Sequence, residues 1–217
     1  MSSRLKDEFF NPKIKLPYNL KIEEVKQAML DTYDFLDRIN STLLKHGYDP
    51  LEEYMESNAF SGLISSILIK NIEKNTTCLV KNRYVGGHPD LIPKDKYPEE
   101  GVLQAEEGIE VKASKQPGGW QGHNPEAGWF MVFRFIHEKG QPIRFVQVLI
   151  AKLEKSDWSF SGRREGSRRT ITASITGSGL HKLRSNPIYQ DPAYVVAKNR
   201  ELKEYYKSLI PTQGALL

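Results

Sequence analysis

Two amphipathic helices are predicted in the first third of the chain. Between residues 20 and 46, apolar side chains recur at steps of three and four residues, which places them on one face of a helix. Asn19 suits the cap at its start, and Gly47 follows its end. A second apolar stripe begins after Asp49, a preferred N-cap residue, and runs to about Lys74. The chain therefore opens with a helical part.

Strands are predicted through the middle of the chain. Residues 129–136 and 143–153 are almost continuously apolar, which is typical of central strands covered on both faces, and the polar residues between them indicate a hairpin. Shorter or alternating patterns predict further strands at 77–85, 89–92, 108–113 and 169–176, with a turn at Gly86-Gly87 and loops at 94–101 and 114–128. Beyond them we expect a short helix near 178–185 and a last helix from a cap at Asp191 to about residue 209.

This order of elements predicts a mixed α/β fold in which a central mixed β-sheet is flanked by helices. A length of 217 residues suits a single domain, and no internal repeat or linker interrupts it. We divide the expected domain 1–217 into an N-terminal helical part (1–48), a catalytic core (49–153) and a basic part with the C-terminal helices (154–217).

Several classes of protein are disfavoured by composition. No apolar run reaches the roughly 18 residues that a membrane span needs, and the first ten residues contain no apolar signal core. The single cysteine, Cys78, excludes an intramolecular disulfide and a cysteine zinc cluster. His88 and His123 lack the close spacing of a typical zinc site. We therefore expect a cytoplasmic protein that does not cross a membrane.

Basic charge is concentrated late in the chain. The formal net charge is +4, but residues 152–184 alone hold eight Lys or Arg against three Asp or Glu. Such a concentration favours a surface for a polyanion such as nucleic acid. A solvated charged face is the alternative.

A short strand, residues 108–113, carries candidate chemistry. Side chains at i and i+2 of a strand share a face, so Glu110 and Lys112 project together while Val111 points to the core. Asp90 lies in the neighbouring predicted strand, 89–92. If the two strands are adjacent, Asp90 and Glu110 converge on one hard cation, because Mg²⁺ prefers carboxylate oxygens. An ordinary strand with one wet and one dry face is the alternative.

Pro89-Asp90 and Glu110-Val111-Lys112 together resemble the motif of the PD-(D/E)XK nuclease superfamily, and the resemblance covers roughly residues 50–153. It implies catalysis by Asp90, Glu110 and Lys112. It also implies Mg²⁺, for which Mn²⁺ can substitute, bound by Asp90, Glu110 and the backbone carbonyl of Val111. A third carboxylate often comes from a preceding helix in such sites; Glu56 is the candidate, and an exposed helix carboxylate is the alternative.

Within this superfamily the chain looks most like a type II restriction endonuclease. That likeness implies a homodimer that cuts double-stranded DNA at a short palindromic site and leaves 5′-phosphate and 3′-hydroxyl ends. Two alternatives remain open: a structure-specific or repair nuclease of the same fold, and a non-catalytic nucleic-acid-binding protein.

Two segments are candidates for DNA contact. The loop after the Glu110 strand is rich in glycine and in amide side chains that can read base edges. The segment 159–172 holds two Arg-Arg pairs, which suit phosphates and guanine edges. A Trp-anchored surface loop and a solvated hairpin are the respective alternatives. The expected contact residues are Ser114, Lys115, Gln121, His123, Asn124, Arg163, Arg164, Arg168 and Arg169.

Overall fold

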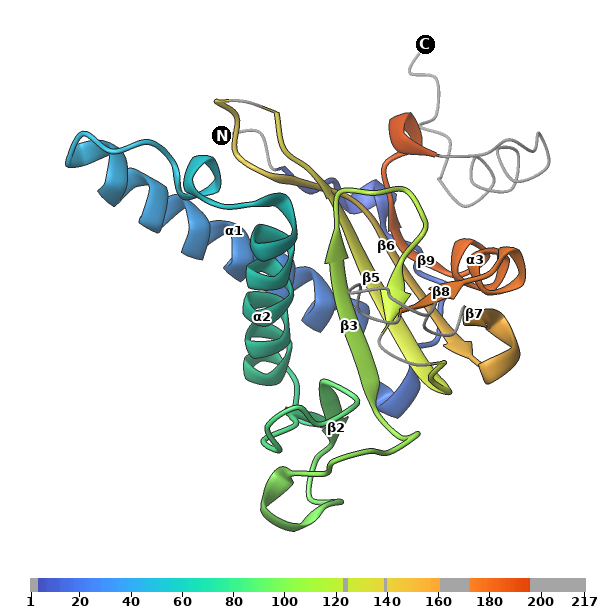
Figure 1. Cartoon of the computed structure of the whole chain (residues 1–217). Coiled ribbons are helices and arrows are strands. Elements are labelled where there is room, and N and C mark those ends of the chain that lie inside the picture. Colours follow the sequence, from blue (N-terminus) through green and yellow to red (C-terminus); the bar gives the residue numbers. More distant parts are fainter. Residues whose placement is uncertain (1–3, 123–124, 139, 161–171, 196–217) are drawn as a thin grey trace, which may run out of the picture.

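A six-stranded mixed sheet forms the centre of the computed structural model, which describes residues 4–122, 125–138, 140–160 and 172–195 (Figure 1). The order of its strands is β1-β2-β3-β5-β6-β9; β3 and β5 are parallel and the other neighbours are antiparallel. Its strands are β1 (Leu79–Lys81), β2 (Leu91–Pro93), β3 (Ile109–Ser114), β5 (Gly128–Ile136), β6 (Arg144–Leu153) and β9 (Pro187–Gln190). The expected mixed α/β class is confirmed.

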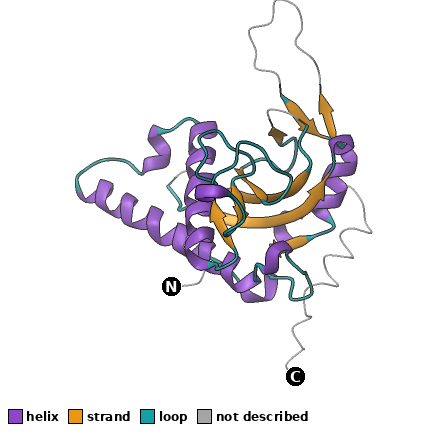
Figure 2. Cartoon of the chain, turned by 90° about the horizontal axis from the view of Figure 1, so that it is seen from below, coloured by secondary structure: helices purple, strands orange, loops and turns teal. Residues whose placement is uncertain are grey.

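Helices cover one face of this sheet, and a helix with a small second sheet covers the other. Figures 1 and 2 show α1 (Ile22–Lys45) and α2 (Ser57–Asn75) together on one side of the strands. On the other side lie α3 (Gly177–Arg184) and a three-stranded sheet of order β4-β8-β7. Its strands are β4 (Gln121–Gly122), β7 (Trp158–Phe160) and β8 (Ala173–Ile175). In the described residues, no helix is both long and apolar enough to cross a bilayer.

Each face of the sheet has its own core. The larger core joins α1 and α2 to the side chains of Val111, Met131 and Phe133. The smaller core lies on the opposite face and contains Phe130 and Trp120. The continuous apolar runs of β5 and β6 follow from this arrangement, because alternate side chains of each strand enter different cores. The predicted β5–β6 hairpin is confirmed, with Gly128 opposite Leu153 at one end of the pair and Ile136 opposite Arg144 at the other.

The start of α1 differs from the prediction. Asn19 lies in a 3-10 turn at positive φ and does not cap the helix. Lys21 is the N-cap instead, and its backbone N–H donates to the Glu24 carboxylate at 2.8 Å. Gly47 follows the helix with φ 78°, as expected for a residue that ends one.

The predicted second helix is broken in two. A 3-10 turn, η3 (Leu51–Tyr54), is followed by extended backbone at Met55, and α2 begins only at Ser57. The cause is tertiary. Asn40 of α1 accepts a hydrogen bond from the Leu51 backbone N–H and donates one to the Glu52 carboxylate, which anchors the turn. Asp49 therefore does not cap α2.

The strands at the edges of the sheets differ from the prediction: some are shorter than expected, and others were not predicted. Strand β1 ends at Lys81 because the buried amide of Asn82 bonds the carbonyls of Pro89 and Val102 and begins a turn. Strands β4, β7 and β9 were missed; all are short. Asp191 caps a 3-10 turn (Pro192–Tyr194), but the remainder of the predicted last helix lies outside the described residues.

Candidate active site

Strand β3 alternates as its sequence predicts. Val111 is buried, at 3% exposure, in the larger core, whereas Glu110 and Lys112 lie on the opposite, partly exposed face. The strand has a buried neighbour on each side: Leu91 of β2 pairs with Ile109, and β5 runs parallel along its other edge. The predicted adjacency of the two strands is therefore confirmed, but β2 begins at Leu91, so Asp90 lies just before the strand rather than in it.

The carboxylate of Asp90 is attached to the backbone of β3. Its Oδ2 accepts a hydrogen bond of 2.9 Å from the Val111 N–H. Burial, and next the negative charge of the nearby Glu110, raise the pKa of Asp90 to about 7. Two carboxyl groups have thus been brought together in a partly buried place, where the charge of Glu110 opposes ionisation of Asp90.

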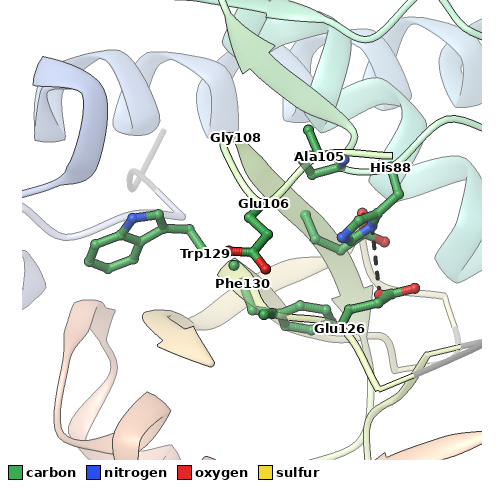
Figure 3. Close-up of a pocket in the computed structure, with 11 residues that line it drawn as sticks. His88, Ala105, Glu106, Gly108, Glu126, Trp129 and Phe130 are labelled. Atoms are coloured by element: carbon green, nitrogen blue, oxygen red, sulfur yellow. Dashed lines mark hydrogen bonds and ion pairs between the residues drawn. The ribbon is translucent and has the colours of Figure 1, made fainter. Parts of the chain in front are cut away.

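Two further side chains complete a cluster around Glu110. His88 Nδ1 lies 3.0 Å from Glu110 Oε2 and 3.6 Å from Glu126 Oε2. Burial lowers the pKa of His88, but hydrogen bonding and attraction to Glu110 outweigh burial and raise it. Figure 3 shows His88 and Glu126 pointing toward one another, while the ring of Trp129 points away from them.

The cluster is compatible with a metal ion. Ligand atoms of His88, Glu110 and Glu126 all lie within 4.8 Å of one another. The three side chains line a pocket of about 10 Å³, the space of roughly one water molecule. Its donors are one imidazole nitrogen and carboxylate oxygens, a set that suits divalent transition metals as well as Mg²⁺.

Sequence reasoning missed this part of the site. His88 was set aside because it has no closely spaced histidine partner, although it directly precedes the Pro89-Asp90 pair. Glu126 was not singled out, and its only signal is that it stands just before the apolar strand β5. Both reach Glu110 through strand pairing, which the local sequence does not encode.

Lys112 shares a face with Glu110 but turns its amine elsewhere. The Nζ donates a hydrogen bond to the backbone carbonyl of Gln121 and lies 5.8 Å from the centre of the Phe130 ring. The side chain therefore ties the candidate catalytic strand to β4. Its expected position on the Glu110 face is confirmed, whereas a direct contact with the two carboxylates is not observed.

Glu56 is not brought to the site. It is the exposed N-cap of α2 rather than a mid-helix residue. The α2 carboxylate near Asp90 is that of Glu73, because Glu73 and Asp90 line one cleft. Seventeen residues of helix separate the two, roughly 25 Å at 1.5 Å per residue. The expectation of Glu56 as a third metal ligand was therefore wrong.

The expected DNA-contacting residues fall into two groups. Gln121 is exposed in β4 and donates to the Ser174 hydroxyl at 3.4 Å, while Ser114 ends β3 and Lys115 lies 5.7 Å from the Phe60 ring centre. Buried Trp120 anchors the described stretch 114–122 in the smaller core. The other expected contacts, His123, Asn124, Arg163, Arg164, Arg168 and Arg169, lie outside the described residues.

The described ends of the two candidate segments meet in the small sheet. Strands β7 and β8, which flank residues 161–171, pair with each other, and β8 also pairs with β4. Gln121 is opposite Ser174 in this small sheet.

Comparison with known proteins does not assign the chain to a family. No family model matches the chain, and no curated protein matches it.

Proposed function

We propose that the protein is a divalent-metal-dependent endonuclease that hydrolyses phosphodiester bonds of double-stranded DNA, most similar in type to a type II restriction enzyme. The observation that carries this proposal is the attachment of Asp90 to the Val111 N–H beside Glu110. This attachment supports the proposal because the carboxylate of the residue just before β2 then lies next to that of Glu110 in β3, a strand that also carries Lys112.

The residues present fit a divalent cation. Repulsion from Glu110 contributes to the high pKa of Asp90, and a cation held between the two carboxylates would relieve it. Asp90, Glu110 and the Val111 carbonyl would hold Mg²⁺ or Mn²⁺, with His88 and Glu126 beside them. The ion would supply charge neutralisation at a phosphate and a more acidic water.

The protein side chains would then divide the remaining work. Glu110 lies on the partly exposed face of β3 with His88 Nδ1 3.0 Å from its Oε2, and there it would accept a hydrogen bond from the water that attacks the phosphate. Lys112 lies on the same face, and we assign it to the phosphate oxygens, where its charge stabilises the transition state. Water attacks phosphorus and gives up a proton to solvent, and the bond to the 3′ oxygen breaks. That oxygen takes up a proton from solvent, so the products are a 5′-phosphate and a 3′-hydroxyl.

A homodimer accompanies this proposal. Helix α1 continues beyond the core: its last buried residue is Leu36, and Phe35, Leu44 and the following Tyr48 are exposed. Figure 1 shows this end of α1 projecting past the sheet. A second copy would cover these apolar side chains, and a two-fold dimer matches a palindromic site.

The proposal is tested by incubating the protein with supercoiled plasmid in Mg²⁺, Mn²⁺ or EDTA and sequencing the cut ends. We expect discrete metal-dependent fragments with 5′-phosphates. Preference for branched DNA without fixed fragments would favour a structure-specific nuclease instead. Tight DNA binding without cleavage in either metal would overturn the enzymatic proposal and leave a binding protein.

A further inference from the structure

A wide cleft beside the candidate site has Asp90 on its wall. It has a volume of about 700 Å³ and lies between the second half of α2 and the turn that joins β1 to β2. Asp90 therefore lies between Glu110, which lines the small metal-compatible pocket, and this open cleft. A polymer whose phosphate reaches Asp90 has room to continue into the cleft.

Basic side chains from both walls border the cleft. Lys70 comes from α2, and Lys81 and Arg83 come from β1 and the turn after it. The carboxylate of Glu73 lies among these basic groups and already has partners. The Lys70 amine lies 2.6 Å from it and the Arg83 guanidinium 3.8 Å from it. The Lys81 backbone N–H also donates a hydrogen bond of 3.2 Å to it. The amine of exposed Lys81 forms no ion pair with any residue that the structure describes.

Two apolar side chains stand at the edge of the cleft. Tyr84 is 50% exposed and Val85 is 94% exposed, and they are adjacent in the turn. Scattered exposed apolar residues are ordinary, but an exposed aromatic residue beside unpaired basic charge is a common feature of nucleic-acid-binding grooves.

The turn is held firmly in place. The buried amide of Asn82 donates to the Pro89 and Val102 carbonyls, and its oxygen accepts from the Tyr84 and Val102 backbone N–H groups at 3.1 and 3.0 Å. Gly87 packs so closely that an added Cβ would come within 2.5 Å of the Val102 carbonyl oxygen. Tyr84 is thus presented by a braced turn, which reduces the entropy lost on binding.

We propose that this cleft binds the DNA strand that enters the candidate site, with Lys81 on a phosphate and Tyr84 against a sugar and base. The inference rests on the proposed function for the identity of the polymer and adds where its backbone runs. It assigns substrate contact to the β1–β2 turn, which was not among the segments expected from the sequence.

The test measures binding of a labelled DNA duplex in EDTA, where no cleavage occurs, by fluorescence anisotropy at several salt concentrations. For Lys81→Ala we expect weaker binding and a slope of log affinity against log salt that is less steep by about 0.9, the value for one lost phosphate contact. For Tyr84→Ala we expect about tenfold weaker binding, and for Tyr84→Phe nearly unchanged binding, because the ring contact is retained.

Exposed residues outside the cleft provide matched controls. Lys13→Ala and Tyr54→Ala remove the same side-chain types at positions that neither line the cleft nor belong to the side chains assigned to the second copy, and they should leave affinity and salt slope unchanged. Melting temperatures of all variants establish that each is folded. Unchanged binding by both Lys81→Ala and Tyr84→Ala, while the wild type binds the duplex, would overturn the cleft assignment.

Failure of this inference is distinguishable from failure of the proposed function. If the wild type cleaves DNA and the cleft variants bind normally, the nuclease stands and the cleft assignment falls. If the variants lose binding as expected but no metal supports cleavage, the cleft stands and the nuclease falls. Binding of RNA without binding of duplex DNA would overturn both.

Discussion

The Asp90 carboxylate accepts a hydrogen bond from the backbone N–H of Val111 at 2.9 Å, although the two residues are 21 positions apart. This contact runs from the residue just before β2 to the middle of β3, and the two strands pair at Leu91 and Ile109. It fixes one carboxylate beside Glu110, and it does so through the backbone of the residue whose own side chain faces the core.

Replacement of Asp90 by asparagine should separate chemistry from folding. Asparagine keeps an oxygen that can accept from the Val111 N–H but removes the charge next to Glu110. We expect Asp90→Asn to lower metal-dependent plasmid cleavage by about 100-fold or more, because charge neutralisation at the phosphate is lost. Duplex binding in EDTA and the melting temperature should not fall. Wild-type turnover by this variant would remove Asp90 from the site.

Lys112 is expected to act on rate rather than on metal binding. Its amine contacts the Gln121 carbonyl and lies apart from the clustered donors of His88, Glu110 and Glu126. Lys112→Ala should therefore reduce cleavage about 100-fold or more while Mn²⁺ affinity, measured by electron paramagnetic resonance titration, stays close to that of the wild type. A parallel loss of Mn²⁺ affinity would show instead that Lys112 shapes the metal site.

The imidazole of His88 should influence which metal is preferred. A nitrogen donor favours Mn²⁺ over Mg²⁺, since affinities for such ligands rise across the transition metals whereas Mg²⁺ prefers oxygen. We expect His88→Ala to weaken Mn²⁺ binding by about tenfold and to change Mg²⁺ binding much less. The control is His46→Ala, an exposed histidine after α1. Equal changes for both metals would exclude His88 as a ligand.

A separate prediction concerns stability and pH. Asp157 is 3% exposed at its side chain and accepts hydrogen bonds from the Lys182 amine at 2.6 Å, the Glu154 N–H at 2.9 Å and the Ser178 hydroxyl at 3.0 Å. Burial opposes its ionisation, but these partners outweigh burial and lower the pKa of Asp157. The group thereby connects α3 to the turn before β7.

Because the folded state lowers this pKa, the ionised group stabilises the fold above the ordinary aspartate pKa of about 3.9. That contribution should be complete above about pH 5 and disappear as the pH falls through the lowered value. We expect Asp157→Asn to reduce the free energy of unfolding at pH 7 by about 3 kcal/mol, with a smaller difference from the wild type below pH 4. Urea unfolding of the variant and the wild type at several pH values measures this difference in the free energy of unfolding.

Asp34→Asn is the matched control, because Asp34 also pairs with a basic residue, Arg38, but on the surface. Its effect on unfolding should be close to zero, as is usual for exposed pairs. A difference between Asp157→Asn and the wild type that stays constant from pH 7 to pH 3 would contradict the assigned ionisation.

Much of the core of this fold is determined by local periodicity. The alternation around Val111 placed its side chain in the core and Glu110 on the opposite face, and the apolar runs of β5 and β6 predicted a central hairpin. These patterns are reliable because a strand must repeat every two residues and a helix every 3.6, and burial selects the apolar face.

Only the tertiary structure decided the composition of the candidate site and the elements at its edges. His88 and Glu126 reach Glu110 because β2 and β5 pair on either side of β3, and no local pattern encodes that pairing. The break before α2 likewise depends on Asn40, an amide on another helix that satisfies the Leu51 backbone N–H. Periodicity selects faces, whereas long-range hydrogen bonds and strand order select neighbours, and a functional site is made of neighbours.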